Sequence, residues 1–439
     1  MAGNARAVKQ RPKTAGNRQV EQPARTQAEQ PARAKKADRV AVVAAGAGAR
    51  GAYEAGALSI ILPVLEDLGQ RPTMFVGTSA GAINAALFAS LAHLPARQAA
   101  AQAVDLWGNM KQSEVFPPAV PSILGALPQY ITRLFGVGHG MTSLLNTKPL
   151  LRTLTDKVDW EQLHQNVETG KVEALAIVAT AASTGRTSIF VEKSESVPRL
   201  PGSDDSRAID YYKRAISANV VRASAAIPAV FPPVLLGDQD DGDWYVDGGV
   251  RLNAPLKPAI SLGASRLVVV ATDPLDYLPV LPGPQPAGPA PIIQDQAAEI
   301  GHGLLADRMV EDIRTLGKVN SLANGKTSPS NNRQYTVIPY IFAGPTAGQV
   351  GQLGQVAASV LESEGSVFKA ITHLDMWLVT RLIGPVKSRG DIMSYLLFEP
   401  EFAQAAIQLG QQDAQRYLDS MGWPPRNGNG HVDIWRTTI

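Results

Sequence analysis

The sequence predicts an α/β fold with a mainly parallel central sheet, because two strand–turn–helix units follow one another near its beginning. In the first unit, an apolar run at 39–45 leads through glycines into a helical pattern over 53–68. In the second, "TMFVG" (73–77) leads into "AGAINAALFASLAHL" (80–94). A helix that connects two neighbouring strands is typical of parallel sheets, so we assign both units to one sheet domain.

Four later segments have the short apolar pattern of buried strands and extend this sheet domain, which we place at residues 39–345. They are "VEALAIVATA" (172–181), "WYVDGG" (244–249), "SRLVVVATD" (265–273) and "YTVIPYIF" (335–342). Seven prolines within 274–291 predict a stiff excursion at the surface. After Gly344-Pro345 the pattern becomes helical, which predicts a helical C-terminal extension at 346–439.

The first 38 residues predict a basic, disordered tail. They contain nine Lys or Arg and three Asp or Glu, and no aromatic residue. Such a segment cannot bury enough apolar surface to fold by itself. A tail that contacts an anionic membrane or a nucleic acid is the alternative. For the whole chain we expect no nucleic-acid partner.

The apolar pattern also bears on location. No apolar h-region of a signal peptide is visible, and no run of about 20 apolar residues could span a membrane. We therefore expect a cytoplasmic protein, with peripheral membrane contact as an open alternative. Between Val115 and Thr147 the only ionised side chain is Arg133, but several prolines interrupt any long helix. This stretch is consistent with a lid, a membrane-facing flap or buried core.

Composition excludes several kinds of site. The chain has no cysteine, which removes disulfides, thiolate metal sites and a cysteine nucleophile. Its six histidines show no spacing typical of metal ligands. We therefore expect no structural zinc site, and separately we expect no cofactor.

The segment Gly77-Thr78-Ser79-Ala80-Gly81 predicts a nucleophile. It has the pattern G-x-S-x-G directly after a strand and before a helix. In that context a sharp turn between small residues exposes the serine hydroxyl at the positive end of the helix. The alternative is a serine that only caps the helix.

Asp247 is the candidate base for this serine, because it leaves a predicted strand into Gly248-Gly249. Two residues without side chains would let its carboxyl group approach another element. A turn aspartate without a catalytic role is the alternative. A histidine base in the order of α/β-hydrolases would come from His302, His373 or His431, none of which lies in a glycine-flanked loop after a clear strand.

The glycines at 46–51 fit two kinds of anion site. Gly46-x-Gly48-x-x-Gly51 matches the dinucleotide-binding pattern, but the following strand ends in Thr78-Ser79 without the acidic residue that would bind a ribose. The same backbone N–H groups could hold the oxyanion of an acyl-transfer reaction. Arg50 would add a positive charge beside them.

With these motifs in place, the chain resembles the patatin-like phospholipases. "GAGARGAYEAGAL", "GTSAGA", "ASAAIPAVFPPV" (223–234) and "DGG" occur in the order of that family, and the likeness spans about 39–343. It implies a three-layer α/β/α fold with Ser79 as nucleophile, Asp247 as its base and Gly77 and Gly81 in the elbow. It also implies that Gly248 and Gly249 lie beside the acid. The oxyanion loop would contain Gly46, Ala47, Gly48, Arg50 and Gly51.

One residue departs from the family pattern, since Ala47 stands where the family has a glycine. If the loop needs a positive φ at that position, Ala47 would be strained by about 1 kcal/mol.

The resemblance implies a serine lipid acyl hydrolase of the phospholipase A or lysophospholipase type. It would act on lipid or acyl-ester substrates through an acyl-enzyme. Two alternatives come from other classes of protein. One is a catalytically weak, membrane-associated interaction protein on the same scaffold. The other is a dinucleotide-binding oxidoreductase, which rests on the glycines at 46–51 alone.

Overall fold

The computed structural model describes most of the chain after residue 37. The described residues are 38–117, 146–197, 199–228, 230–237, 242–272, 274, 308–323, 336–346, 349, 351–363, 390, 393–425 and 432–438. Several expectations fall outside them: the tail at 1–37, most of the 115–147 stretch, the proline-rich excursion, and His302, His373 and His431.

The strands of the described residues form one sheet of nine strands. Its order is β5-β4-β3-β2-β1-β8-β9, and β7 pairs with β3 and with β6. The bounds are β1 (Val40–Ala44), β2 (Pro72–Thr78), β3 (Ala174–Ala181), β4 (Thr187–Lys193), β5 (Ile209–Lys213), β6 (Val234–Leu236), β7 (Asp243–Asp247), β8 (Arg266–Val270) and β9 (Tyr340–Ala343). The run from β3 through β2, β1 and β8 to β9 is parallel throughout, which confirms the predicted sheet.

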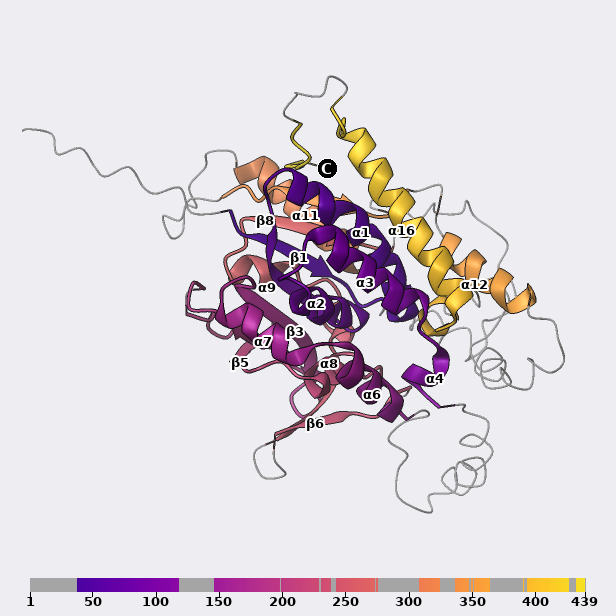
Figure 1. Ribbon diagram of the computed structural model, residues 1–439. Helices are drawn as coiled ribbons and strands as arrows, with labels where there is room; N and C mark the ends of the chain where they lie inside the picture. The colour runs from indigo at the N-terminus through magenta and orange to yellow at the C-terminus, as the bar shows by residue number, and fades with distance from the viewer. Residues whose placement is uncertain are drawn as a thin grey trace, which may run out of the picture. The chain divides into compact units, whose positions relative to one another are not determined.

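Helices cover both faces of the sheet, as Figure 1 shows. Their bounds are α1 (Gly51–Asp67), α2 (Ala80–Ser90), α3 (Ala96–Gly108), α4 (Gln112–Val115), α6 (Lys148–Lys157), α7 (Trp160–Glu168), α8 (Ala218–Ser224), α9 (Leu256–Ser261), α11 (Arg308–Ala323), α12 (Gln352–Ser363) and α16 (Pro400–Ser420). Alternate residues of β1 belong to two separate cores, Val40 and Val42 to one and Ala41 and Val43 to the other. The first core includes α1, α2, α3 and α16, and the second includes α9 and α11. The fold is therefore a three-layer α/β/α sandwich.

Sequence and structure differ mainly at the edges of the sheet. β9 begins at Tyr340 although the pattern suggested 335–342, because Pro339 has no N–H for the ladder. The hairpin strands β4 and β6 and the edge strand β5 were not predicted. β5 is exposed or half-buried beyond Ile209, so its sequence "IDYYK" lacks a continuous apolar signal.

The C-terminal helix α16 packs closely on α1. A Cβ atom added to Gly410 would lie 2.1 Å from the carbonyl oxygen of Tyr53, so only glycine fits at this crossing. The Tyr53 hydroxyl donates a hydrogen bond of 2.7 Å to Asp413 Oδ2. The described residues from 38 onward group into one compact unit. Within the described part of the chain, no helix combines the length and apolar character needed to cross a membrane.

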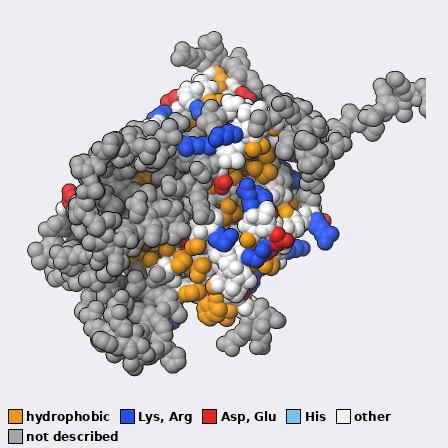
Figure 2. Space-filling model, turned by 180° about the vertical axis from the view of Figure 1, so that it is seen from behind, with side chains coloured by type: hydrophobic (Ala, Val, Ile, Leu, Met, Phe, Trp, Pro, Cys, Tyr) orange, Lys and Arg blue, Asp and Glu red, His pale blue; other side chains and the backbone are white. Residues whose placement is uncertain are grey.

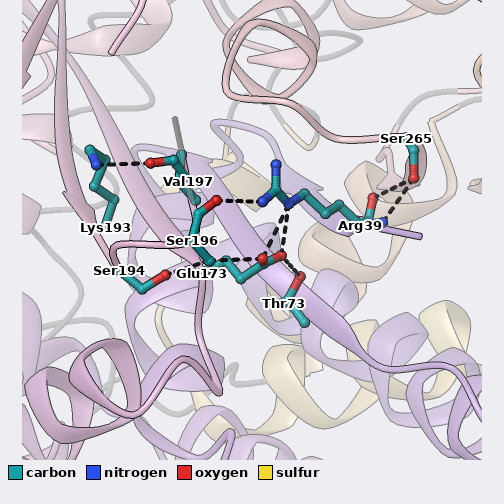
Figure 3. A network of polar contacts seen from close by, with 8 residues as sticks. All are labelled: Arg39, Thr73, Glu173, Lys193, Ser194, Ser196, Val197 and Ser265. Carbon is teal, nitrogen blue, oxygen red and sulfur yellow. Dashed lines mark hydrogen bonds and ion pairs between the residues drawn. The ribbon is translucent and has the colours of Figure 1, made fainter. Parts of the chain in front are cut away.

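A polar network joins the amino-terminal ends of the central strands (Figure 3). Arg39 Nε lies 3.1 Å from Glu173 Oε1, and Thr73 Oγ1 donates to Glu173 Oε2 over 2.7 Å. The backbone N–H of Arg39 donates to Ser265 Oγ over 2.8 Å. These residues lie at the starts of β1, β2, β3 and β8. The candidate site lies at the opposite end of the sheet, beyond the carboxyl ends of the parallel strands.

Candidate active site

Ser79 lies in a strained turn between β2 and α2. Its backbone angles are φ 54° and ψ −123°, and its side chain is only 5% exposed. A positive φ is unfavourable for any residue with a Cβ atom, so the surrounding structure must hold it there. Such strain between a strand and a helix is the signature of a nucleophile elbow.

The two predicted elbow glycines allow the chain to pass through this turn. A Cβ atom on Gly77 would lie 2.2 Å from the carbonyl oxygen of Gly81. One on Gly81 would lie 2.3 Å from the carbonyl oxygen of Ala44. No larger residue fits at either position without a shift of the backbone.

Asp247 reaches the same edge of the sheet from β7. Within the sheet, Thr78 is the partner of Val178 on β3, and Asp247 is the partner of the next residue, Ala179. Because β4 occupies the other side of β3 at both positions, β2 and β7 pair with the same side of β3, and Thr78 and Asp247 are brought next to each other along it. Gly248 follows directly and touches β3, since a Cβ atom there would lie 2.5 Å from the carbonyl oxygen of Val178.

The Asp247 carboxyl group is buried and has a raised pKa. It is 2% exposed, and Oδ1 accepts a 2.7 Å hydrogen bond from the backbone N–H of Gly249. Burial raises its pKa from 3.8 to about 6, while the Ser79 side chain and the Gly249 N–H act in the opposite direction. Oδ2 is shielded from solvent and completes no hydrogen bond with any described residue. The Ser79 side chain lies close enough to this carboxyl group to lower its pKa.

Ser224 on α8 holds the backbone of Ser79, a contact that the G-x-S-x-G pattern does not predict. Its hydroxyl accepts a 2.8 Å hydrogen bond from the backbone N–H of Ser79 and donates one of 2.6 Å to the carbonyl oxygen of Val178. Ser224 belongs to the stretch "ASAAIPAVFPPV" that was quoted for the family resemblance. The sequence therefore marked the region but not the contact.

The glycine-rich loop is not strained at Ala47. Ala47 has φ −138° and ψ −4°, whereas the positive φ of the loop, +54°, falls on Gly48. The expected cost of a methyl group at Ala47 therefore does not arise. Gly46 lies next to Ser79, because a Cβ atom on it would lie 3.3 Å from Ser79 Cβ.

Several backbone N–H groups of this loop are already used. The N–H of Gly46 donates to the carbonyl oxygen of Asn253 over 3.3 Å, and that of Arg50 to Ala47 over 3.0 Å. The N–H of Gly51 closes the short helical turn η1 (Gly48–Arg50). By contrast, no described residue accepts a hydrogen bond from the N–H of Ala47, Gly48 or Ala49. These three N–H groups are therefore the candidates in this loop for contact with a ligand.

The Arg50 side chain points into the C-terminal part of the chain. It is 2% exposed, and its Nε donates to Ser394 Oγ over 2.7 Å. Its guanidinium group also lies 4.0 Å from the centre of the Tyr395 ring. The sequence predicted a positive charge beside the loop but not this distant partner.

A second buried carboxyl group, Glu54, holds the start of the loop. Its Oε1 accepts from the N–H of Ala45 and its Oε2 from Asn84 Nδ2, each over 2.9 Å. Trp107 Nε1 completes the network with a 2.7 Å bond to Asn84 Oδ1. Burial raises the pKa of Glu54 to about 8, partly offset by the hydrogen bonds from Asn84 and Ala45. The network joins the loop to α1, α2 and α3.

An apolar cavity lies against Ser79. Its lining includes Gly48 and Ser79, with Ile227 and Phe231 from the segment after α8 and Phe398 from the C-terminal part. None of the lining residues that the structure describes is charged. The cavity volume is about 20 Å³, which is room for about one water molecule. Among the residues that the structure describes, no three His, Asp or Glu side chains gather as metal ligands would.

A comparison with protein families matches residues 42–260 to the family described as patatin-like phospholipase. The matched segment contains Ser79, Asp247 and the glycine-rich loop. No curated protein matches the chain.

Solved structures with some similarity to this chain include two from bacteria and one of a human phospholipase. VipD from Legionella pneumophila is 14% identical with a TM-score of 0.31, and the match covers 87% of this chain and 67% of VipD. Human GIVD cytosolic phospholipase A2, in complex with methyl gamma-linolenyl fluorophosphonate, is 13% identical with a TM-score of 0.34, and the match covers 87% of this chain and 57% of that one. The heterodimeric ExoU–SpcU complex from the type III secretion system of Pseudomonas aeruginosa is 16% identical with a TM-score of 0.28. The match covers 90% of this chain and 73% of that one. We draw no conclusion from likenesses this low, and the chain spans less than two thirds of the human phospholipase.

Proposed function

Because the chain belongs to the patatin-like phospholipase family, we propose that it is a serine lipid acyl hydrolase in which Ser79 attacks and Asp247 is the base. The single observation that carries this proposal is the joint position of the two residues. A strained serine follows β2, a buried carboxyl group ends β7, and the two strands pair with neighbouring residues on the same side of β3. The carboxyl group is close enough for the serine side chain to act on its pKa.

The first half of the reaction forms an acyl-enzyme. Asp247 takes the proton of the Ser79 hydroxyl while Oγ attacks the carbonyl carbon of the ester. The negative charge that develops on the carbonyl oxygen is held by N–H groups of the glycine-rich loop, at roughly 3–4 kcal/mol for each well-placed donor. Asp247 then gives its proton to the leaving alcohol as the ester bond breaks.

The second half releases the acid. Asp247 takes a proton from water, whose oxygen attacks the acyl carbon, and then returns the proton to Ser79 Oγ as the fatty acid leaves. A carboxylate with a pKa near 6 suits this role better than an exposed aspartate. It is still ionised at neutral pH, yet it binds a proton about a hundred times more tightly.

The apolar lining of the cavity supports an acyl substrate, because hydrocarbon gains by contact with side chains such as Ile227 and Phe231. Contact with a membrane is a further proposal. On the face in Figure 2, Lys and Arg side chains lie among hydrophobic ones, together with a few Asp or Glu side chains. Among the described residues, Trp244 is a large apolar side chain that is 52% exposed. This composition would favour an anionic lipid surface.

The small volume of the cavity favours a second candidate, a catalytically weak interaction protein on the same scaffold. Hydrolysis assays separate the two. Purified protein is incubated with lysophospholipid, phospholipid and p-nitrophenyl butyrate, and released acids are identified by mass spectrometry. Our proposal expects turnover by the wild type and by Ser90→Ala, and at least about a thousand-fold less by Ser79→Ala or Asp247→Asn. Equal turnover by all four proteins would remove the proposed dyad.

A further inference from the structure

A short C-terminal segment, residues 393–398, lies against the glycine-rich loop, and we call it the strap. It lies well beyond residue 260, where the family match ends. Arg50 anchors it: Nε donates to Ser394 Oγ over 2.7 Å, and a terminal nitrogen donates to the Tyr395 hydroxyl over 3.1 Å. The guanidinium group also packs 4.0 Å from the Tyr395 ring centre. Arg50 and Ser394 are both buried, so these bonds are shielded from competing water.

The strap backbone touches the loop directly. A Cβ atom on Gly48 would lie 2.2 Å from the carbonyl oxygen of Tyr395 and 3.2 Å from its Cα. Gly48 also has the positive φ of the loop and lines the cavity beside Ser79. The backbone of the strap therefore lies directly against Gly48, one of the residues whose N–H group is proposed to hold the oxyanion.

Three strap side chains form part of the cavity wall. They belong to Tyr395, Leu396 and Phe398. Leu397 is also buried, at 1% exposure, but it does not line the cavity. Phe398 stands edge-on to Phe116, with ring centres 6.1 Å apart. Phe116 in turn contacts Phe231, another lining residue, over 5.9 Å. Aromatic contacts of this kind fix the ring of Phe398 in place.

The wall leaves little room. With a cavity volume of only about 20 Å³ between these side chains, the carbons of an acyl chain that enters the cavity from Ser79 must press against them or displace them. The size of the strap side chains must then decide how many carbons fit. An apolar pocket discriminates between chains that differ by one methylene by about 10- to 200-fold.

We propose that the strap is the wall of the acyl-binding pocket and that Leu396 and Phe398 set the length of the acyl chain the enzyme accepts. The ligand is the hydrocarbon chain of a single acyl group in an ester. This inference rests on the proposed hydrolase function and adds to it the element that selects the substrate. That element belongs to a part of the chain outside the family match.

The test compares kcat/KM for p-nitrophenyl butyrate and p-nitrophenyl laurate in the wild type, Phe398→Ala, Leu396→Ala and Leu397→Ala. We expect the laurate-to-butyrate ratio to rise by about ten-fold or more in Phe398→Ala and Leu396→Ala. Leu397→Ala is the matched control, since it shortens a buried leucine of the strap that does not line the cavity, and its ratio should equal that of the wild type. A ratio unchanged in both lining variants, or raised equally in the control, would overturn the inference.

A binding measurement keeps this inference separate from the proposed function. Titration calorimetry with free laurate and free butyrate needs no turnover. The lining variants should favour laurate over butyrate more than the wild type does. If the wild type hydrolyses neither ester but this shift in binding is found, the hydrolase proposal fails and the assignment of the pocket wall stands. If esters are hydrolysed but neither ratio moves, only the assignment of the wall fails. If Phe398→Ala fails to fold, Leu396→Ala still tests the inference, because Leu396 is only half-buried and its replacement disturbs the fold less.

Discussion

The backbone N–H of Ser79 donates a 2.8 Å hydrogen bond to the hydroxyl of Ser224, which passes a hydrogen bond of 2.6 Å to the carbonyl oxygen of Val178. All three residues are buried. These two hydrogen bonds connect the strained turn at Ser79 to β3, the strand that pairs with Asp247. They explain how the unfavourable φ of Ser79 is maintained, because the Ser224 hydroxyl ties the backbone of the turn to the backbone of the strand.

Replacing Ser224 by alanine tests this relationship. The variant leaves the N–H of Ser79 and the carbonyl oxygen of Val178 without that partner, which should lower the free energy of unfolding by about 1–3 kcal/mol. Because the nucleophile is then less well positioned, we expect kcat for a short ester to fall by about ten-fold or more, with little change in KM. Ser90→Ala is the control. It removes a buried hydroxyl that bonds to Leu87 on the same helix, α2, and it should cost stability without lowering kcat.

The pH dependence of hydrolysis reports on Asp247. Its proton must be lost before it can act as a base, and burial raises its pKa to about 6. We therefore expect kcat/KM to be half-maximal near pH 6 and to reach a plateau above it. A half-maximal value near pH 4, close to the ordinary aspartate value of 3.8, would mean that the acting base is not this buried group.

Because burial raises its pKa, Asp247 lowers the free energy of unfolding when it is ionised. The folded state keeps the proton up to about pH 6, whereas the unfolded chain loses it near 3.8, so the free energy of unfolding falls as pH rises through this window. Asp247→Asn has no proton to lose. We expect it to be more stable than the wild type at pH 7.5 by up to about 3 kcal/mol, and no more stable at pH 3.5.

Urea unfolding at the two pH values measures this difference. Asp156→Asn, at an exposed position of α6, controls for the removal of one negative charge. A variant Asp247→Asn that is less stable than the wild type at pH 7.5 would show that the carboxylate is held by favourable contacts rather than strained by burial.

The crossing of α1 and α16 predicts a site that accepts no side chain. In Gly410→Ala the new methyl group would lie 2.1 Å from the carbonyl oxygen of Tyr53, so the two helices must move apart. We expect a loss of about 1–3 kcal/mol in the free energy of unfolding. Gly108→Ala, also beside α16, places its methyl group at least 3.6 Å from its neighbours and should be close to neutral. Equal thermal stability of both variants would contradict the observed packing.

Local sequence patterns predicted the parts of the protein that depend on neighbouring residues. The strand ends at Thr78 and Asp247 and the elbow around Ser79 are short-range features, and the structure contains each of them. The joint placement of the two residues followed from the family resemblance. The dyad itself stays a proposal.

Contacts between distant segments were not predictable in the same way. Arg50 and Ser394 are 344 residues apart, and nothing in either local pattern indicates the other. The conformation at Ala47 was also open, because one turn can place its positive φ on either of two adjacent residues. The contact of Ser224 with Ser79 depends on how α8 rotates against β3, which periodicity alone does not set.

The most direct test of the proposed mechanism is covalent labelling by an alkyl fluorophosphonate, with the modified residue located by peptide mass spectrometry. We expect the wild type to carry one adduct, on Ser79, formed at a rate that rises through pH 6 as Asp247 ionises. Asp247→Asn should label at least about a hundred-fold more slowly. Labelling of Ser79 at the same rate in both proteins, or the absence of an adduct on Ser79 in the folded wild type, would contradict the mechanism.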